Sequence, residues 1–321
     1  ICNPARSTYT VIFGSRVNNG ARGELYCSPG PSETLRISKA ESWIGYGKLL
    51  LLKGVSMFLE RHFVEKPWGR DDLPPEFGAH GWQRIGEIWY NGVGQSPLPL
   101  LVKWMFTSEK LSIQVHPLEA DAKQRGLASG KEECWYIVDA EPGAVLGIGT
   151  NRALSAEELR TASLSGEIEQ LLDWKTVRAG DYFYIPAGTI HAIGAGITLV
   201  EVQQPADITY RLFAYGRPRE LHLEDGVAVA LPAPYADARS GHVSGNLKLA
   251  EGPHFWLHHI VDEAGKGSIK DGGPYWLVPG FRHSTHDGVP TAPGGCIIGG
   301  SLEQLQVGQD SSLLIAGITK A

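Results

Sequence analysis

Gln114 and His116 are polar residues within an apolar stretch, residues 111–116, that is typical of a β-strand. Side chains two residues apart on an extended strand share a face, so the carboxamide and the imidazole point to one target. Ile113 and Val115 then point to the other face. We therefore expect Gln114 and His116 to act together at a site inside the protein.

Glu133 and His191 are two further polar residues placed beside predicted strands. Glu133 opens an apolar stretch on the same face as Trp135, where an ionised carboxylate needs a cation or several hydrogen-bond donors. His191 follows an apolar strand after Pro186 and Gly188, two residues that reshape the backbone to present the imidazole. Each therefore has the chemistry to join the first pair.

Two imidazoles, a carboxylate and a carboxamide oxygen form a ligand set suited to a borderline divalent ion. Zinc is the first expectation, with manganese, iron or cobalt as substitutes. Any one of these residues alone is more often a hydrogen-bonded core residue, so the prediction depends on all four meeting. The predicted metal ligands are Gln114, His116, Glu133 and His191.

Short strands separated by turns are the elements that would position these residues. Alternating and continuous apolar runs predict strands at residues 99–106, 111–116, 134–138, 144–148, 182–185, 197–203 and 209–214. The first two are separated by a polar turn and are interpreted as a hairpin. Ser155 and Glu158 form a capping-box pattern, which predicts one helical insertion near residues 155–173.

A second β-rich half follows, with strands expected at residues 255–261, 275–278, 296–298 and 312–316. No comparable polar cluster stands inside these strands, so this half is expected to be metal-free. Glycine (40 residues) and proline (20) punctuate the apolar runs throughout, which favours a mainly β fold. We expect a metal-binding domain at residues 57–222 and a C-terminal half at 223–321.

Residues 1–56 are patterned differently. They hold seven basic residues against three acidic ones, and their apolar residues follow no sustained period. Met57 stands just before the region in which the apolar residues become regularly spaced. We therefore interpret residues 1–56 as a leader that lies outside the fold. The alternative is an extension that packs on the domain as a strand.

Composition excludes several classes of protein. A net charge of −6 provides no basic field for a nucleic acid, and no apolar stretch is long enough to span a membrane. The four cysteines lack CxxC spacing, which favours a reducing cytoplasm over a disulfide framework.

Residues 180–191 match Gly-x5-Pro-x-Gly-x2-His, a pattern that resembles the second metal motif of the cupins. Six ordered blocks, over roughly residues 64–223, resemble type I phosphomannose isomerases more specifically. They are EKPWG (65–69), GEIWY (86–90), LSIQVHP (111–117), GKEECWYIV (130–138), IPAGTIHAIG (185–194) and ITYRLFAYGR (208–217). The resemblance implies a cupin-type double-stranded β-helix, or jelly roll, with a degenerate cupin-like second half.

The resemblance also implies a metal-dependent aldose–ketose isomerase that interconverts mannose 6-phosphate and fructose 6-phosphate through an enediolate. The family's metal ligands fall on the same four residues reached from strand parity. Its active-site arginine falls on Arg211, its lysine on Lys131 and an acidic residue on Glu201. Some relatives carry a tyrosine where this chain has Ile193, which leaves no phenol for a role there.

Chemical roles follow for these residues. Glu201 is the first candidate for the general base, with a pKa raised by a dry interior. The alternatives are that it pairs with Arg211 or Lys131 and orients them, or that a metal-bound water is the base. Lys131 and Arg211 are expected to bind the phosphate or stabilise the enediolate, and Trp68 to shape the sugar pocket.

Two other functions stay open at this level. One is a cupin that binds a sugar phosphate as a sensor without converting it. The other is a cupin of different chemistry, such as an iron-dependent dioxygenase, which would favour more histidines than this ligand set has. The expected partner is a small sugar phosphate, and the expected assembly is a monomer or homodimer.

Overall fold

The computed structural model describes residues 56–78, 83–91, 98–269, 273–280, 284–286, 289–291, 293–308 and 311–319. Before residue 56 it describes only the backbone of four short strands, Tyr26–Cys27 (β1), Leu35–Arg36 (β2), Trp43–Tyr46 (β3) and Leu49–Leu52 (β4). The predicted leader, residues 1–56, otherwise lies outside the described residues.

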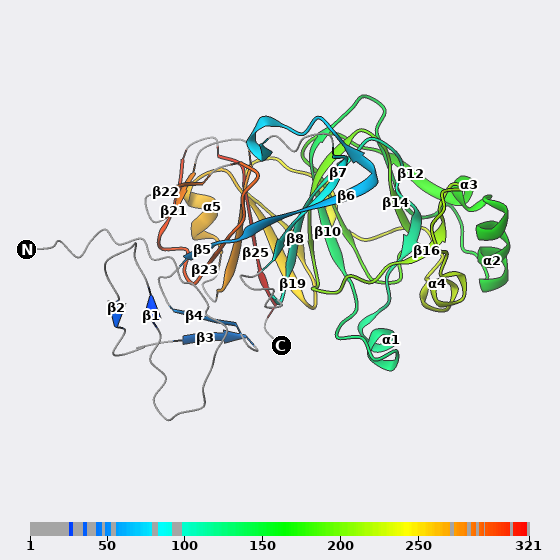
Figure 1. Cartoon of the computed structure of the whole chain (residues 1–321), viewed down its shortest axis with the longest axis horizontal. Helices are drawn as coiled ribbons and strands as arrows, with labels where there is room; N and C mark the ends of the chain where they lie inside the picture. The colour runs from blue at the N-terminus through cyan, green and yellow to red at the C-terminus, as the bar shows by residue number, and fades with distance from the viewer. Residues whose placement is uncertain are drawn as a thin grey trace, which may run out of the picture.

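A central antiparallel sheet runs through the middle of the molecule (Figure 1). Its strand order is β17-β13-β10-β15-β8-β7-β6. The strands are β6 (Glu60–Arg70), β7 (Ile85–Asn91), β8 (Leu101–Thr107), β10 (Glu133–Ala140), β13 (Asp181–Ile185), β15 (Ile197–Gln203) and β17 (Ser240–His242).

A second antiparallel sheet, here called the outer sheet, faces the central sheet in the order β12-β11-β14-β9-β16. It contains β9 (Ile113–Val115), β11 (Val145–Thr150), β12 (Leu172–Thr176), β14 (His191–Ile193) and β16 (Tyr210–Phe213). Together the two sheets form the mainly β, jelly-roll architecture expected from the sequence.

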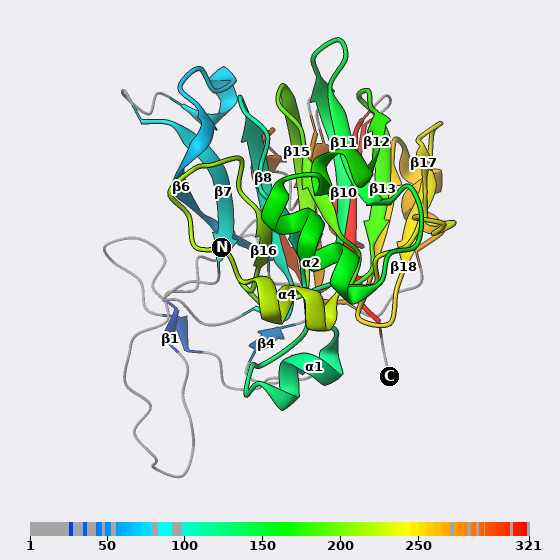
Figure 2. The same ribbon diagram turned by 90° about the vertical axis from the view of Figure 1, so that its right-hand side faces the viewer.

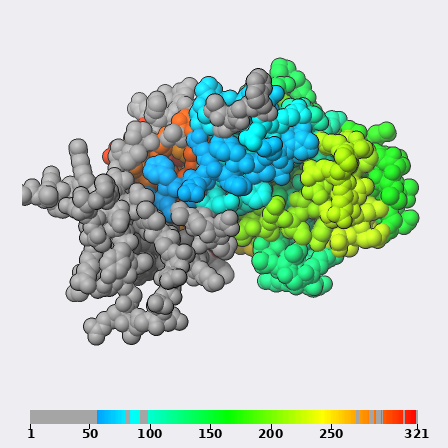
Figure 3. Space-filling view, in the orientation of Figure 1, coloured from blue at the N-terminus to red at the C-terminus, as the bar shows by residue number. Residues whose placement is uncertain are grey.

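The C-terminal part adds a third layer. Its sheet contains β18 (Leu247–Glu251), β19 (Phe255–Ile260), β25 (Leu313–Ile318), β20 (Tyr275–Pro279), β23 (Ile297–Gly299) and β5 (Ser56–Phe58), in that order. A smaller sheet contains β22 (Val289–Thr291), β21 (Ser284–His286) and β24 (Leu305–Val307). In Figure 3 the segment from residue 56 onward, in blue, runs across the visible surface beside the orange C-terminal part.

Both faces of the central sheet are covered, which explains why its strands read as continuous apolar runs. Every residue of β8 and β15 is buried. Met105 and Trp135 pack in the core shared with the outer sheet, while Trp104 packs with Trp276 in the core shared with the C-terminal sheet. A charged residue inside these strands therefore needs a partner.

Helices cover the outer sheet (Figure 2). The predicted insertion forms α2 (Ala156–Ser165) and α3 (Ile168–Leu171), and the capping box of Ser155 and Glu158 is present. Gly166, with φ 83°, ends α2 and divides the insertion in two. The remaining helical elements of the described residues are η2 (Pro75–Phe77), α1 (Glu119–Gln124), α4 (Leu223–Val229) and α5 (Glu263–Gly267).

The hairpin predicted for residues 99–116 is wrong. β8 pairs with β7 and β15 in the central sheet, whereas β9 pairs with β14 and β16 in the outer sheet. The polar turn carries the chain across from one sheet to the facing one. This crossing brings residues of β8 and β9 to opposite walls of one interior.

The domain borders at residues 56 and 222 stay predictions. β5 pairs with β23 of the C-terminal sheet, and β17, which follows residue 222, pairs with β13 of the central sheet. None of the helices in the described part of the chain has the length and apolar character needed to cross a membrane.

Candidate metal and sugar-phosphate site

Strand register brings three of the predicted site residues side by side. On neighbouring strands of the outer sheet, Arg211 of β16 is opposite Gln114 of β9, which is opposite His191 of β14. Glu133 approaches from β10 of the central sheet, and His116 directly follows β9. The site is therefore formed between the two facing sheets.

The predicted metal ligands meet at the floor of this interior. Ligand atoms of His116, Glu133 and His191 all lie within 4.8 Å of one another, and each residue is 1% exposed. His191 Nε2 is 3.3 Å from Glu133 Oε1, and His116 Nε2 is 3.5 Å from Glu133 Oε2. Gln114 Nε2 is 3.3 Å from His191 Nε2, so a half turn of this amide brings its oxygen to the same place.

Backbone carbonyls fix the tautomers of both histidines. His116 Nδ1 donates to the Ile208 carbonyl at 2.6 Å, and His191 Nδ1 donates to the Thr189 carbonyl at 2.9 Å. Each Nε2 lone pair is thus directed at the cluster. Burial lowers the pKa of His116 well below its ordinary value and that of His191 to about 4, so both imidazoles are neutral, as metal ligands must be.

Glu133 supplies the negative charge. Neither of its carboxylate oxygens accepts a hydrogen bond within the described residues, although Lys131 Nζ lies 2.9 Å from Oε2. Burial raises the pKa of Glu133 to about 7, and Lys131 opposes that rise. A buried carboxylate beside two neutral imidazoles and a carboxamide fits a divalent ion such as zinc.

Glu201 has a different environment from the one expected. Its Oε1 is 3.0 Å from Lys103 Nζ, and its Oε2 accepts a hydrogen bond from Trp135 Nε1 at 3.0 Å. Burial alone would raise the pKa of Glu201, but Lys103 and then Lys131 outweigh it and lower the pKa to about 2. The expected rise is therefore wrong, and the ion-pair partner is Lys103 rather than Arg211 or Lys131.

A cavity of about 380 Å³ lies beside the predicted metal ligands: Gln114 lines it, whereas the buried His116, Glu133 and His191 do not. Its lining includes Gln114, Lys131, Trp68, Lys103 and Glu201. Trp68 is buried in this wall, and its role in shaping a sugar pocket stays a prediction.

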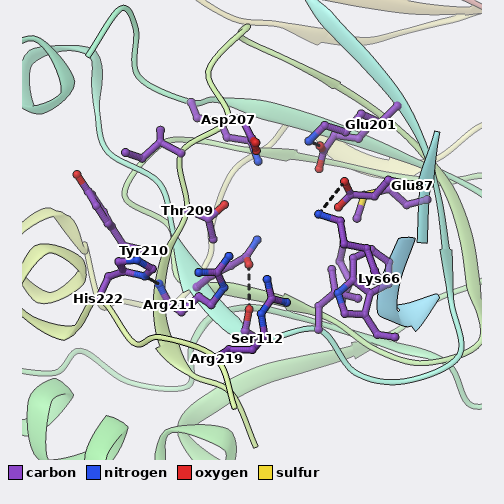
Figure 4. A pocket seen from close by; sticks show the side chains of 18 residues that line it. Lys66, Glu87, Ser112, Glu201, Asp207, Thr209, Tyr210, Arg211, Arg219 and His222 are labelled. Carbon is purple, nitrogen blue, oxygen red and sulfur yellow. Dashed lines mark hydrogen bonds and ion pairs between the residues drawn. The ribbon is translucent and has the colours of Figure 1, made fainter. Parts of the chain in front are cut away.

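One end of the cavity is rich in arginine. Figure 4 shows the Arg211 and Arg219 side chains close together beside Ser112, away from Glu201. Arg211 Nε is buried without a hydrogen-bond partner among the described residues. Burial and the charges of Arg211 and Arg217 lower the pKa of Arg219, which marks a cationic cluster that an anion would stabilise.

Sequence reasoning missed several residues of this cavity. Lys103 stands alone in the apolar run of β8, so the test of polar residues inside strands would have found it. Arg219 lies in a loop and had no such signal. Lys66 and Glu87 form an ion pair at 3.3 Å in the opposite wall. Of these two residues only Glu87 gave a signal in the sequence, a weak one, because it is an acidic residue in an otherwise apolar strand.

Comparison with curated proteins finds relatives of this chain. Mannose-6-phosphate isomerase of Streptococcus mutans is 33% identical over 265 residues, which cover 69% of this chain and 83% of that protein. No protein-family model matches the chain.

Solved structures share the fold. The structure of mannose 6-phosphate isomerase from Bacillus subtilis superposes with a TM-score of 0.66 at 26% identity, over 81% of this chain and 99% of that one. The Salmonella typhimurium enzyme bound to fructose 6-phosphate and zinc has a TM-score of 0.59 at 14% identity, over 82% and 99% of the two chains. The chain belongs to the mannose-6-phosphate isomerase family.

Proposed function

We propose that this protein interconverts mannose 6-phosphate and fructose 6-phosphate with one divalent ion, zinc first, held by Gln114, His116, Glu133 and His191. Family membership supports the reaction. The observation that carries the proposal is the buried His116–Glu133–His191 cluster, which contacts Gln114 and Lys131 in the lining of a cavity with an arginine-rich end. Such a cavity suits a small polar ligand with one anionic end.

The reaction moves a proton between C1 and C2 of the sugar and passes through an enediolate. A bound divalent ion supplies Lewis-acid stabilisation of the charge that develops on the sugar oxygens. Lys131 Nζ lies 3.1 Å from His116 Nε2 and 2.9 Å from Glu133 Oε2, at the edge of the cluster. We assign Lys131 as a hydrogen-bond donor to a sugar oxygen at that edge.

The phosphate is assigned to the arginine-rich end. A phosphate accepts paired hydrogen bonds from the planar guanidinium group, which suits Arg211 and Arg219. Arg211 also neighbours Gln114 in the sheet, so it joins the phosphate end to the metal end. Trp68 forms part of the wall against which the carbon chain of the sugar would lie.

Lys103 and Glu201 act as a pair on the central-sheet wall. Burial opposes the charged form of Lys103, but the carboxylates of Glu201 and Glu87 together outweigh burial and raise its pKa, so Lys103 stays protonated. Lys103 then offers a fixed donor to a sugar oxygen, and Glu201 orients it. A role for Glu201 as general base stays a prediction, and its lowered pKa weakens it as a base near neutral pH.

Turnover by metal-stripped protein, assayed before and after divalent ions are restored, tests this function. We expect conversion of mannose 6-phosphate to fructose 6-phosphate to appear with the ion. Binding of sugar phosphate without conversion, whichever ion is added, would favour the sensor. No observation favours the dioxygenase.

The proposed ligand is a small sugar phosphate rather than a nucleic acid, in keeping with the net charge of −6. Cys134 and Cys296 are free thiols, which suits a reducing compartment, and we place the protein in the cytoplasm. Its assembly as a monomer or homodimer stays a prediction that light scattering would decide.

A further inference from the structure

We infer that Glu119 and Gln204 are positioning residues for the reaction: together they hold the segment that carries Lys131 and Glu133 against the segment that carries His116. This inference rests on the proposed function, because it assigns the two residues to the alignment of the proposed metal site. Neither side chain lines the cavity.

Glu119 and Gln204 form a continuous bridge between the two segments. Glu119 Oε2 accepts hydrogen bonds from the Gly130 amide at 2.9 Å and from Gln204 Nε2 at 3.1 Å. Gln204 Oε1 then accepts a hydrogen bond from the Glu132 amide at 3.0 Å. The amides on both sides of Lys131 are thus bound through one pair of side chains.

Backbone hydrogen bonds complete this contact. The Lys131 amide donates to the Pro117 carbonyl at 3.1 Å, and the Gln204 amide donates to the Glu132 carbonyl at 3.1 Å. The His116 carbonyl accepts a hydrogen bond from the Gly188 amide at 2.8 Å, which connects the segment that carries His116 to the loop before His191. Four stretches of the chain, at residues 116–119, 130–132, 188 and 204, are therefore joined next to the cluster.

Gly130 shows how close the two segments lie. A Cβ at this position would be 2.6 Å from the Glu119 nitrogen and 2.8 Å from the Pro117 carbonyl oxygen. No side chain fits there, so the Glu119 carboxylate reaches the Gly130 amide directly. A loss of the carboxylate leaves this amide and Gln204 without their acceptor, and the segment is free to shift.

A shift of this segment would act on chemistry more than on overall stability. Lys131 and Glu133 are 4% and 1% exposed at their side chains and lie 2.9 Å apart, so they move together with the backbone that carries them. The arginines at the other end of the cavity belong to a different loop and strand. We therefore expect changes in ion affinity and kcat, with little change in KM for the sugar phosphate.

The test compares Glu119→Ala, Glu119→Gln and Gln204→Leu with the unaltered protein. Each is measured for zinc affinity by competition with a chromophoric chelator, for kcat and KM at saturating zinc, and for the Tm of the zinc-free protein. Ser155→Ala is the matched control, because it removes a side-chain acceptor of a backbone amide at the α2 capping box, on the outer face of the molecule.

We expect Glu119→Ala and Gln204→Leu to weaken zinc binding and lower kcat by about 10-fold, since groups that orient metal ligands typically change affinity by ~10–100-fold. Glu119→Gln retains an acceptor oxygen and should restore most of both, losing only the surface ion pair with Lys123. Ser155→Ala should lower Tm while zinc affinity and kcat stay unchanged.

Unchanged zinc affinity and kcat in Gln204→Leu and Glu119→Ala, with a fall in Tm like that of Ser155→Ala, would overturn the inference. If Glu119→Ala does not fold, Gln204→Leu decides by the same criteria. If the unaltered protein binds zinc but does not convert the sugar phosphate, the proposed function fails, and the zinc affinities still decide whether these residues position the site.

Discussion

Lys103 Nζ lies 3.0 Å from Glu201 Oε1, and both side chains are 4% exposed. The two residues are direct cross-strand partners on β8 and β15, and Trp135 is opposite Glu201 on the other side. The indole of Trp89 lies on the far side of Lys103, 4.9 Å from its ammonium group. This row fixes both charges in the wall of the cavity.

Replacement of Lys103 alone should be costly. Lys103→Met leaves the Glu201 carboxylate buried without its cation, and we expect the free energy of unfolding to fall by about 3–5 kcal/mol. The double variant Lys103→Met/Glu201→Gln should recover part of this loss, because the neutral carboxamide that replaces the carboxylate keeps an acceptor for Trp135. Denaturant titration measures both.

The exposed pair of Lys248 and Glu251 provides the control, since Lys248→Met should change stability by at most about 1 kcal/mol. A double variant less stable than Lys103→Met would show that the two charges do not act as a pair. Turnover should also be non-additive, with the double variant no slower than the slower single one.

Arg219 should determine the response to phosphate. Arg219→Ala is expected to raise KM for mannose 6-phosphate by about 10–100-fold through the loss of charge-assisted hydrogen bonds. Any slow conversion of unphosphorylated mannose should be unaffected. Steady-state kinetics with both sugars measures the difference, and the exposed Arg178→Ala is the control. An equal loss with both sugars would place Arg219 away from the phosphate.

His258 should make the protein sensitive to acid. Burial, aided by Lys248 and opposed by Glu251, lowers the pKa of His258 to about 4 from its ordinary 6.5, and its ring stands edge-on to Trp256. Because the unfolded chain binds the proton more readily, stability should be complete above pH 6.5 and fall as the pH drops toward 4.

His258→Gln should therefore show a smaller drop in Tm between neutral and mildly acidic pH than the unaltered protein does. The drop persists in part because burial also lowers the pKa of the neighbouring His259. His242→Gln, at an exposed position, is the control. Equal drops in all three proteins would exclude His258 as a source of the acid sensitivity.

Strand parity was enough to select Gln114, His116 and Glu133, which the structure brings close to His191. Gln114 and Glu133 stand out because a polar side chain on the buried face of a strand requires a hydrogen-bond partner or an ion. In the structure that face lines the interior between the two sheets. Parity is a local property, so it needs no knowledge of which strands pair.

The environment of Glu201 could not be predicted in the same way. Its partner Lys103 lies 98 residues earlier in the chain and meets it only through the pairing of β8 with β15. The mistaken hairpin at residues 99–116 has the same cause, because local pattern does not tell which of two facing sheets a strand joins. Arg219, in a loop, depends on the folded path of the chain alone.

Ion content and turnover, measured on the same samples of the unaltered protein and of His191→Ala, test the central claim most directly. The unaltered protein should carry one divalent ion per chain and convert mannose 6-phosphate, and the variant should lose both together. A folded His191→Ala that keeps a full equivalent of the ion, or that converts the sugar phosphate without one, would contradict the account.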